Sequence, residues 1–285
     1  MVSGRTKLLG IIGYPVAHSL SPRMHNAAFA ADSTGPGGVE YAYVAMNVRP
    51  ECLPAAVRGL KVLGFVGFNV TMPHKEMVLS LMDELDESAR LSGAVNTVIS
   101  NNGKLKGLNT DGSGFAEACE EAGVSLSGRR VMVLGAGGAA AAIAVAALGE
   151  GASGLFLVNR TFSKAEELRA KLSKVSRGDE ISVRPLGELG EAAAEADVLI
   201  NATYLGMNEE DPLPLPAEVL TAEKVVCDAV YVAGGETALI RRAREIGARA
   251  VSGGRMLLYQ GVQAQRVWTG REPSVGVMSD ALARS

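Results

Sequence analysis

The stretch GFNVTMPHK, residues 67 to 75, is an apolar run that gives way to polar side chains and a proline. The run is rich in aromatic and β-branched residues, which predicts a buried parallel strand over residues 65 to 70. Pro73 cannot extend a strand ladder but suits the first turn of a helix. We therefore expect three polar side chains at the carboxyl end of this strand, where open α/β sheets bind ligands. These side chains are Asn69, Thr71 and Lys75. An amide, a hydroxyl and a cation there suit a small polyhydroxylated molecule, although a capped helix with Lys75 in solvent fits the same sequence.

Predicted strands and helices alternate along the whole chain, which favours an α/β architecture with parallel sheets. We expect strands at residues 8–13, 41–45, 65–70, 95–99, 104–108, 130–134, 155–158, 181–183, 198–200 and 225–228. We expect helices at residues 22–31, 50–63, 236–246 and 256–269 and directly after Asp111, and a glycine-rich loop at residues 32–38. The sequence Asn101-Asn102-Gly103 predicts a hairpin turn between two of these strands, so the first sheet is expected to be mixed.

The composition excludes several classes of protein. The 285 residues allow one large domain or two medium ones, and an apolar content of 47% is enough for a core. A net charge of −3 without a basic stripe argues against a nucleic-acid partner. Cys52, Cys119 and Cys227 are odd in number and far apart, which fits a reducing cytoplasm better than a disulfide framework. The histidines lack the spacing of a zinc site, so no metal is predicted.

One segment, residues 131 to 149, is uncharged and long enough to span a bilayer. Its glycine cluster at residues 135–138, however, divides it into a short strand and an alanine-rich helix, and Ala and Gly contribute little to membrane insertion. The N-terminus lacks the basic segment and apolar core of a signal sequence. We therefore predict a soluble cytoplasmic protein with no membrane partner.

The glycine cluster fits G-x-G-x-x-A, the alanine variant of the dinucleotide-binding fingerprint, between a predicted strand and a predicted helix. Gly135 permits the tight turn, Gly137 lets the backbone approach a pyrophosphate at the helix N-terminus, and Ala140 permits close helix–strand packing. The predicted cofactor contacts in this loop are Gly135, Ala136, Gly137, Gly138 and Ala139. The same motif alone would also fit a glycine-rich site of close helix packing. Its place between a predicted strand and a predicted helix favours a nucleotide-binding loop.

The end of the next strand indicates which nucleotide is bound. An NAD site usually has Asp or Glu there, which accepts hydrogen bonds from the ribose 2′-hydroxyl. This chain has Asn159, Arg160 and Thr161 instead. Arg160 can hold a 2′-phosphate with two hydrogen bonds and stack under the adenine, while Thr161 offers a hydroxyl and Lys164 lies one turn away. NADP is therefore the predicted cofactor; the alternative is an arginine in solvent at a strand end.

Two serines near the N-terminus are candidates for anion binding. Ser19 and Ser21 lie two residues apart, so in an extended segment their hydroxyls point to the same side and can donate hydrogen bonds to a carboxylate. The structural alternative is an ST-turn followed by a helix that Ser21 caps.

Taken together, these segments resemble the shikimate dehydrogenase family. Residues 13–22, GYPVAHSLSP, resemble the substrate loop of the family, and residues 69–75 resemble its lysine motif. Asn96-Thr97 and residues 109–112, NTDG, resemble the next two signatures, and Asn159-Arg160-Thr161 resembles the motif that selects NADP. The matches continue to the C-terminus, so the resemblance covers nearly the whole chain in the order of the family.

Three further segments match, two of them with a departure. Residues 201–207, NATYLGM, resemble a segment beside the cofactor, but Tyr204 replaces the usual small residue. Residues 228–231, DAVY, resemble another motif, which has Pro two residues after the Tyr where this chain has Ala233. Residues 254–264 resemble the final motif.

The resemblance implies a reversible reduction of 3-dehydroshikimate to shikimate, with NADP as cofactor, in the pathway to chorismate and the aromatic amino acids. Lys75 and Asp111 are implied to meet between two domains and to exchange the proton of the reacting hydroxyl, although most Lys and Asp side chains are solvated surface charges. The residues implied to bind the substrate are Ser19, Ser21, Asn69, Thr71, Asn96, Tyr231 and Gln260. The remaining implied cofactor contacts are Thr203, Met207 and Gly253.

The implied architecture has two α/β domains in a monomer or homodimer. A mixed α/β substrate-binding domain is expected at residues 1–110, completed by C-terminal helices from about residue 252 to 285. A Rossmann-type, doubly wound NADP domain is expected at residues 111–251. Two other functions fit the sequence: a quinate or dual quinate/shikimate dehydrogenase, and a non-catalytic dinucleotide-binding sensor. The presence of both Lys75 and Asp111 argues against the sensor.

Overall fold

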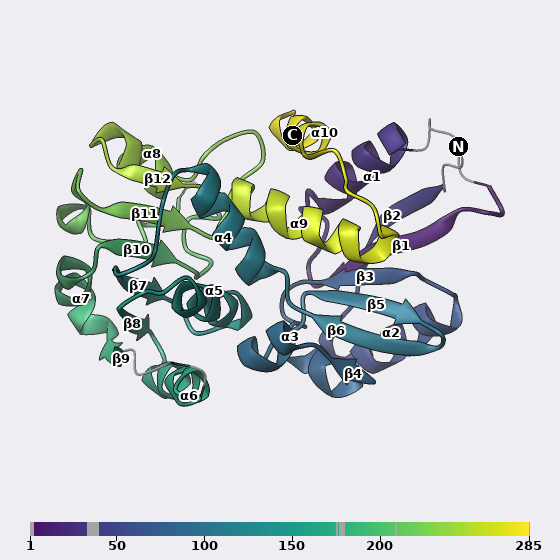
Figure 1. The fold of residues 1–285 in the computed structure, drawn as a ribbon, viewed down its shortest axis with the longest axis horizontal. Coiled ribbons are helices and arrows are strands. Elements are labelled where there is room, and N and C mark those ends of the chain that lie inside the picture. Colours follow the sequence, from purple (N-terminus) through teal and green to yellow (C-terminus); the bar gives the residue numbers. More distant parts are fainter. Residues whose placement is uncertain (1–2, 33–39, 175, 177–179, 209, 285) are drawn as a thin grey trace. The chain divides into compact units, whose positions relative to one another are not determined.

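The computed structural model describes residues 3–32, 40–174, 176, 180–208 and 210–284, and is shown in Figure 1. The chain divides into two units, one of Met1–Thr110 with Gln260–Ser285 and the other of Asp111–Tyr259. The division falls inside helix α9 (Gly253–Thr269), whose first residue lies next to the expected boundary near residue 252. Apart from Asp32, the glycine-rich loop expected at residues 32–38 lies outside the described residues.

The first unit is built on a six-stranded mixed sheet with the order β2-β1-β3-β5-β6-β4. Its strands are β1 (Lys7–Gly13), β2 (Tyr41–Asn47), β3 (Gly67–Val70), β4 (Glu84–Leu85), β5 (Thr97–Asn101) and β6 (Lys104–Leu108). β1, β2 and β3 are parallel, whereas β5 runs antiparallel to both β3 and β6. The predicted mixed sheet and hairpin are thus confirmed, and Asn102 and Gly103 adopt the positive φ angles, 50° and 75°, that the hairpin turn requires.

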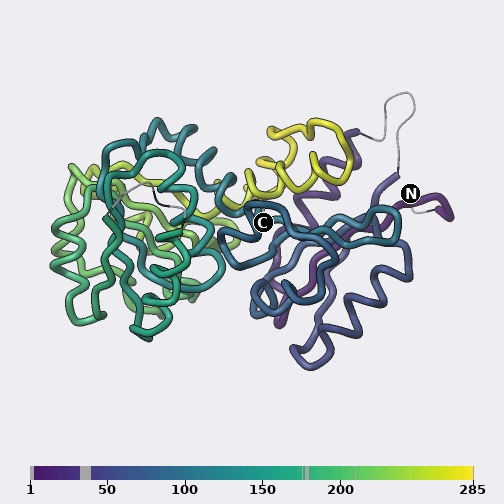
Figure 2. The backbone as a smooth tube through the Cα atoms, turned by 60° about the horizontal axis from the view of Figure 1, so that its bottom comes forward, coloured from purple at the N-terminus to yellow at the C-terminus, as the bar shows by residue number. Residues whose placement is uncertain are grey.

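Helices cover both faces of this sheet. The helical elements of the first unit are α1 (Ser21–Asp32), η1 (Pro50–Cys52), α2 (Leu53–Val62), η2 (Met77–Leu81), α3 (Glu87–Ser92), most of α9, and α10 (Val275–Ala283). α2 presents Leu53, Val57 and Leu60 to one face at helical spacing. On the other face Phe29 of α1 and Trp268 of α9 share a core cluster. α10 lies beside α1, as Figures 1 and 2 both show.

The second unit is a doubly wound parallel sheet with the order β12-β11-β10-β7-β8-β9. Its strands are β7 (Arg130–Leu134), β8 (Gly154–Asn159), β9 (Glu180–Pro185), β10 (Val198–Asn201), β11 (Val225–Asp228) and β12 (Arg249–Val251). The strand order reverses between β7 and β10, and sheets of this type bind ligands at such a point. The predicted α/β architecture with a Rossmann-type unit is confirmed.

Helices flank this second sheet on both faces as well. They are α4 (Asp111–Glu121), α5 (Gly138–Gly149), α6 (Phe162–Leu172), η3 (Leu186–Glu188), α7 (Leu189–Glu195), η4 (Ala217–Val219) and α8 (Ala238–Glu245). α4, α5 and α6 contribute to the core on one face, and α7 and α8 to the core on the other. Residues 131–149 form β7 and α5, as expected from their glycine cluster. Among the described residues, no helix has both the length and the apolarity needed to cross a membrane.

The structure corrects one expectation and adds short elements. Pro73 does not begin a helix: the chain turns after β3, with the N–H of His74 bonded to the Thr71 carbonyl at 2.9 Å, and only the short helix η2 follows. The Nε2 atom of His74, 2.7 Å from the Val48 carbonyl, helps to hold this turn. The short strands β4 and β12 were not expected, because each is too brief to show a clear period, whereas α10 lies within the C-terminal helices expected at residues 252–285.

Candidate functional site

Five of the seven predicted substrate residues, together with Lys75, lie at one edge of the first sheet. β1 and β3 are parallel neighbours, so the loops that follow them leave the sheet at the same edge. The loop after β1 carries Ser19 and leads to Ser21, and the segment after β3 carries Thr71 and Lys75. Asn96 directly precedes β5, which is antiparallel to β3 and pairs Thr97 with Asn69. It therefore lies at this edge too.

Asn69 is the centre of a buried hydrogen-bond network at this edge. Its side-chain nitrogen donates to the carbonyl of Asn96 and to Oγ1 of Thr97, both at 3.0 Å. Its Oδ1 accepts a hydrogen bond from the hydroxyl of Tyr43 at 2.6 Å. Because every one of these groups is buried, unmade hydrogen bonds would be costly and the network fixes the side chains in place.

The network extends to the residue that precedes Asp111. Asn96 Nδ2 donates to Oγ1 of Thr110 at 3.0 Å, and the Thr110 N–H donates to Oδ1 of Asn96 at 2.8 Å. Asp111 begins α4 and is 5% exposed. In the chain, Asp111 directly follows Thr110, which these two hydrogen bonds hold.

The other predicted substrate residues are placed as follows. The Ser21 N–H donates to Oγ of Ser19 at 3.3 Å, so the ST-turn of the structural alternative is present, and Ser21 begins α1. Lys75 is half-buried. Tyr231 is half-buried after β11, and Gln260, 8% exposed, lies on α9.

The loop after β7 has the geometry of a dinucleotide-binding turn. Gly135 has a φ of 125°, and a Cβ atom there would lie 2.8 Å from the Ala202 carbonyl oxygen, so only glycine fits. Gly137 caps the N-terminus of α5, and a Cβ atom there would meet no heavy atom within 4 Å. Open space at a helix N-terminus suits the pyrophosphate of a dinucleotide.

The residues predicted to select NADP lie beside this loop. β8 pairs with β7, and the Gly135 N–H donates to the Val158 carbonyl at 2.8 Å. Arg160 and Thr161 are exposed directly after β8, and Lys164 is exposed in the first turn of α6. Asn159 Nδ2 donates to the Thr161 carbonyl at 2.8 Å, which holds this corner.

A second buried network joins the loops after β10 and β11. Asp228 accepts hydrogen bonds from Asn201 Nδ2 at 2.9 Å, from the Val230 N–H at 3.0 Å and from the Thr237 hydroxyl at 2.6 Å. Asn201 Oδ1 in turn accepts from the backbone and the hydroxyl of Thr203. Burial raises the pKa of Asp228 above its ordinary value, although its three hydrogen bonds act in the opposite direction.

The remaining predicted cofactor residues lie in or beside these loops. Met207 is half-buried, and its N–H donates to the Tyr204 carbonyl at 3.2 Å. Tyr204, the departure from the family pattern, is 63% exposed. Gly253 begins α9, and a Cβ atom there would lie 2.2 Å from the Val230 carbonyl oxygen. The glycine therefore lets α9 begin against the loop after β11.

Sequence reasoning missed several residues that hold the site together. Tyr43, Thr97, Thr110, Asn201 and Asp228 are buried and hydrogen-bonded to predicted site residues or to their neighbours. Four of them lie within motifs that resemble the family, and this membership could have identified them. Tyr43 lies outside every motif, so nothing in the sequence pointed to it.

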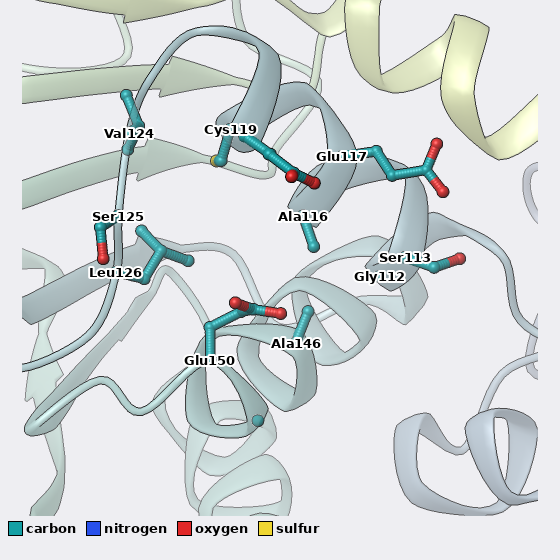
Figure 3. A pocket seen from close by; sticks show the side chains of 12 residues that line it. Gly112, Ser113, Ala116, Glu117, Cys119, Val124, Ser125, Leu126, Ala146 and Glu150 are labelled. Atoms are coloured by element: carbon teal, nitrogen blue, oxygen red, sulfur yellow. The ribbon is translucent and has the colours of Figure 1, made fainter.

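A surface pocket of about 750 Å³ lies in the second unit, between α4, the segment 124–126 and the end of α5. Figure 3 shows its lining, with Glu117 and Glu150 among the labelled side chains. The lining includes three carboxylates, those of Glu117, Glu120 and Glu150, and no basic side chain. An anionic dinucleotide would be repelled there, so the pocket is not a candidate cofactor site. Within the described residues no group of three or more His, Cys, Asp or Glu is placed to hold a metal ion.

The chain matches three family models. Residues 11–98 match the shikimate dehydrogenase substrate binding domain, and residues 117–208 match the shikimate/quinate 5-dehydrogenase model. Residues 253–283 match the shikimate 5′-dehydrogenase C-terminal domain. The matches follow the order of the motifs and confirm the resemblance drawn from them.

Known proteins are similar to this chain over almost its full length. A shikimate dehydrogenase (NADP(+)) from Rubrobacter xylanophilus is 58% identical over 99% of this chain and 97% of its own. A crystal structure of a shikimate dehydrogenase in complex with NADP+ has a TM-score of 0.90 and 40% identity, covering 99% of this chain and 96% of that one. The shikimate 5-dehydrogenase of Thermus thermophilus, in complex with NADP(H) and shikimate, has a TM-score of 0.84 and 36% identity, covering 98% and 99%.

Proposed function

The chain belongs to the shikimate dehydrogenase family, and from this premise we propose that it catalyses the NADP-dependent, reversible reduction of 3-dehydroshikimate to shikimate. The reaction is a step of the shikimate pathway to chorismate and the aromatic amino acids. The observation that carries the proposal is the buried network of Asn69, Asn96 and Thr110, because Asp111 follows it directly in the chain. Fixed, neutral polar groups suit a polyol better than an apolar substrate.

The substrate residues divide by the chemistry they offer. The hydroxyls of Ser19 and Ser21 are proposed to donate hydrogen bonds to the substrate carboxylate. The ring hydroxyls are proposed to bind to neutral amides and hydroxyls, which can both donate and accept. These residues are Asn69, Thr71, Asn96, Tyr231 and Gln260.

Lys75 and Asp111 are proposed to manage the proton of the reacting hydroxyl. Oxidation of a secondary alcohol removes a hydride from carbon and a proton from oxygen, so the protein needs a group that takes the proton and later returns it. A lysine amine with a carboxylate partner can hydrogen-bond the reacting oxygen and exchange that proton. Lys75 follows β3 at the edge where Asn69 and Thr71 lie, which supports this role.

The second unit is proposed to hold NADP. Bound there, NADP supplies the chemistry of accepting or returning the hydride. A Cβ atom at Gly137 would enter open space at the N-terminus of α5, where a pyrophosphate can bind, and the exposed guanidinium of Arg160 can hold the 2′-phosphate. The proposed contacts are Gly135, Ala136, Gly137, Gly138, Ala139, Asn159, Arg160, Thr161, Lys164, Thr203, Met207 and Gly253.

We also propose that the enzyme works in the cytoplasm as a monomer or homodimer. The free thiols of Cys52, Cys119 and Cys227 support a reducing compartment. No membrane or nucleic-acid partner is proposed for the reaction.

A steady-state assay tests the proposed function. The purified chain is supplied with shikimate or quinate, each with NADP or NAD, and the absorbance of the reduced nicotinamide is followed. We expect the highest kcat/KM for shikimate with NADP. A higher kcat/KM for quinate would assign the chain to the quinate dehydrogenases, and no turnover with any pair would leave a dinucleotide-binding protein without this activity.

A further inference from the structure

The side chain of Tyr43 reaches across one strand to the substrate edge of the first sheet. β2 pairs Tyr43 with Leu9 of β1, and β3 pairs Asn69 with Ile11 of β1. Because Leu9 and Ile11 lie two residues apart on one strand, the side chains of Tyr43 and Asn69 point to the same face. The Tyr43 ring therefore spans β1, and its hydroxyl meets Asn69 Oδ1 at 2.6 Å.

The backbone and the ring of Tyr43 are both held in place. β2 is an edge strand, so the backbone of Tyr43 has no strand to pair with on its outer side. The side chain of Asn26 on α1 makes these hydrogen bonds instead. Its Nδ2 donates to the Tyr43 carbonyl at 2.8 Å, and its Oδ1 accepts from the Tyr43 N–H at 2.9 Å. The ring of His25 stacks on the Tyr43 ring with 4.4 Å between centroids. Tyr43 is 2% exposed, so its hydroxyl has a fixed position rather than a range of positions.

The hydrogen bonds of Asn69 determine which way its amide faces. Both hydrogens on Nδ2 are used, one by the Asn96 carbonyl and one by Thr97 Oγ1. Rotating the amide by half a turn would put Oδ1 3.0 Å from the Asn96 carbonyl oxygen, where two acceptors repel. Oδ1 must therefore face Tyr43, whose hydroxyl takes one of its two lone pairs. The capacity that Asn69 retains for a ligand is the second lone pair of Oδ1.

We infer that Asn69 meets the substrate as an acceptor, which takes a hydrogen bond from a ring hydroxyl, and that Tyr43 is the positioning residue that fixes this acceptor. The inference rests on the proposed function. A carboxylate offers only acceptors and would be repelled by the remaining lone pair, so Asn69 selects for a hydroxyl at this point of the ring. Without the Tyr43 hydroxyl, Asn69 Oδ1 loses the hydrogen bond that holds it in place. The substrate hydroxyl must then compete with water for a hydrogen bond to this oxygen.

The test compares Tyr43→Phe with Tyr41→Phe. Both changes remove one oxygen atom from β2, but Tyr43→Phe removes the hydrogen bond to Asn69, and it keeps the ring that stacks on His25. Each enzyme is assayed with shikimate and with two analogues, each lacking one of the ring hydroxyls that are not oxidised. A neutral hydrogen bond is worth a factor of about three to ten in affinity. We expect Tyr43→Phe to raise the shikimate KM by about that factor, with the NADP KM unchanged and Tyr41→Phe without effect.

The analogues separate positioning from a general structural role. For the analogue that lacks the hydroxyl bound by Asn69, we expect wild type and Tyr43→Phe to have equal KM values within about twofold. A structural role predicts the same rise for every substrate and a raised NADP KM as well, and that result would overturn the inference. An unchanged shikimate KM in Tyr43→Phe would overturn it too. Absence of shikimate turnover in the wild type contradicts the proposed function instead.

Discussion

Asn201 donates a hydrogen bond from its side-chain nitrogen to Oδ1 of Asp228 at 2.9 Å, and this bond joins the ends of two neighbouring strands, β10 and β11, where their loops begin. The same two side chains hold Thr203 in one loop and Val230 in the other. These loops lie on one side of the point where the strand order reverses, so the pair sets the shape of half of the proposed cofactor site.

Replacing Asp228 should therefore affect both stability and cofactor binding. Asp228→Ala leaves three buried donors without an acceptor, and each such loss costs about 1–3 kcal/mol. We expect the free energy of unfolding in urea to fall by about 3–5 kcal/mol and the KM for NADP to rise. Asp228→Asn keeps an oxygen for Asn201 and Val230, so we expect a loss of about 1–2 kcal/mol. Equal losses for the two variants would show that the carboxylate charge, which both variants remove, matters more than the number of hydrogen bonds kept.

Arg160 should determine the preference for NADP over NAD. A hydrogen bond to a charged group contributes about 1.5–3 kcal/mol, so Arg160→Ala should lower the ratio of kcat/KM for NADP to that for NAD by roughly ten- to a hundredfold. The change should appear in the cofactor KM, because the 2′-phosphate is remote from the hydride.

Arg169→Ala is the matched control for that prediction. Arg169 lies on α6 and pairs with Glu166, so its removal also deletes one exposed guanidinium from the region. We expect the NADP/NAD ratio to stay unchanged in this variant. If Arg160→Ala and Arg169→Ala behave alike, then Arg160 contacts no phosphate.

Stability should depend on pH through His25. Burial lowers the pKa of the His25 imidazole from its usual 6.5 to about 4, although the hydrogen bond with Gln265 acts in the opposite direction. The folded state then binds fewer protons than the unfolded state between these values, so this stabilisation is complete above pH 6.5 and is lost as the pH falls towards 4. The loss amounts to about 3 kcal/mol.

Urea titrations at pH 7 and pH 4.5 measure this contribution. We expect the decrease in unfolding free energy between the two to be clearly smaller for His25→Gln than for wild type. His18→Gln, which removes an exposed histidine, should show the wild-type decrease. A wild-type decrease in His25→Gln would mean that other groups cause the acid sensitivity.

Local sequence predicted the elements that depend on local chemistry. The apolar run before Thr71, the Asn102-Gly103 turn and the glycine loop at 135–138 each define their own backbone conformation, and each is present where expected. The prediction of a helix that begins at Pro73 was wrong. Hydrogen bonds between this segment and residues outside it, such as that between His74 and Val48, hold the chain in a turn.

Partners that are distant in sequence could not be predicted in this way. Tyr43 and Asn69 are 26 residues apart, and Asn201 and Asp228 are 27 apart. Whether such side chains meet depends on which strands become neighbours in a sheet, and hydrophobic periodicity reports the type of an element but not its neighbours. The candidate residues of the site were thus predictable, whereas the groups that hold them in place were not.

Lys75 is proposed to handle the proton of a shikimate hydroxyl while the hydride is transferred to NADP. The most direct measurement is the kcat of Lys75→Ala with shikimate and NADP, together with its shikimate affinity by calorimetric titration. Lys61→Ala, which removes a lysine that pairs with Asp83, is the control and should retain wild-type kcat. We predict that Lys75→Ala loses turnover while shikimate affinity stays within about tenfold of wild type, because proton transfer rather than binding is removed. An unchanged kcat in Lys75→Ala would show that Lys75 does not transfer the proton.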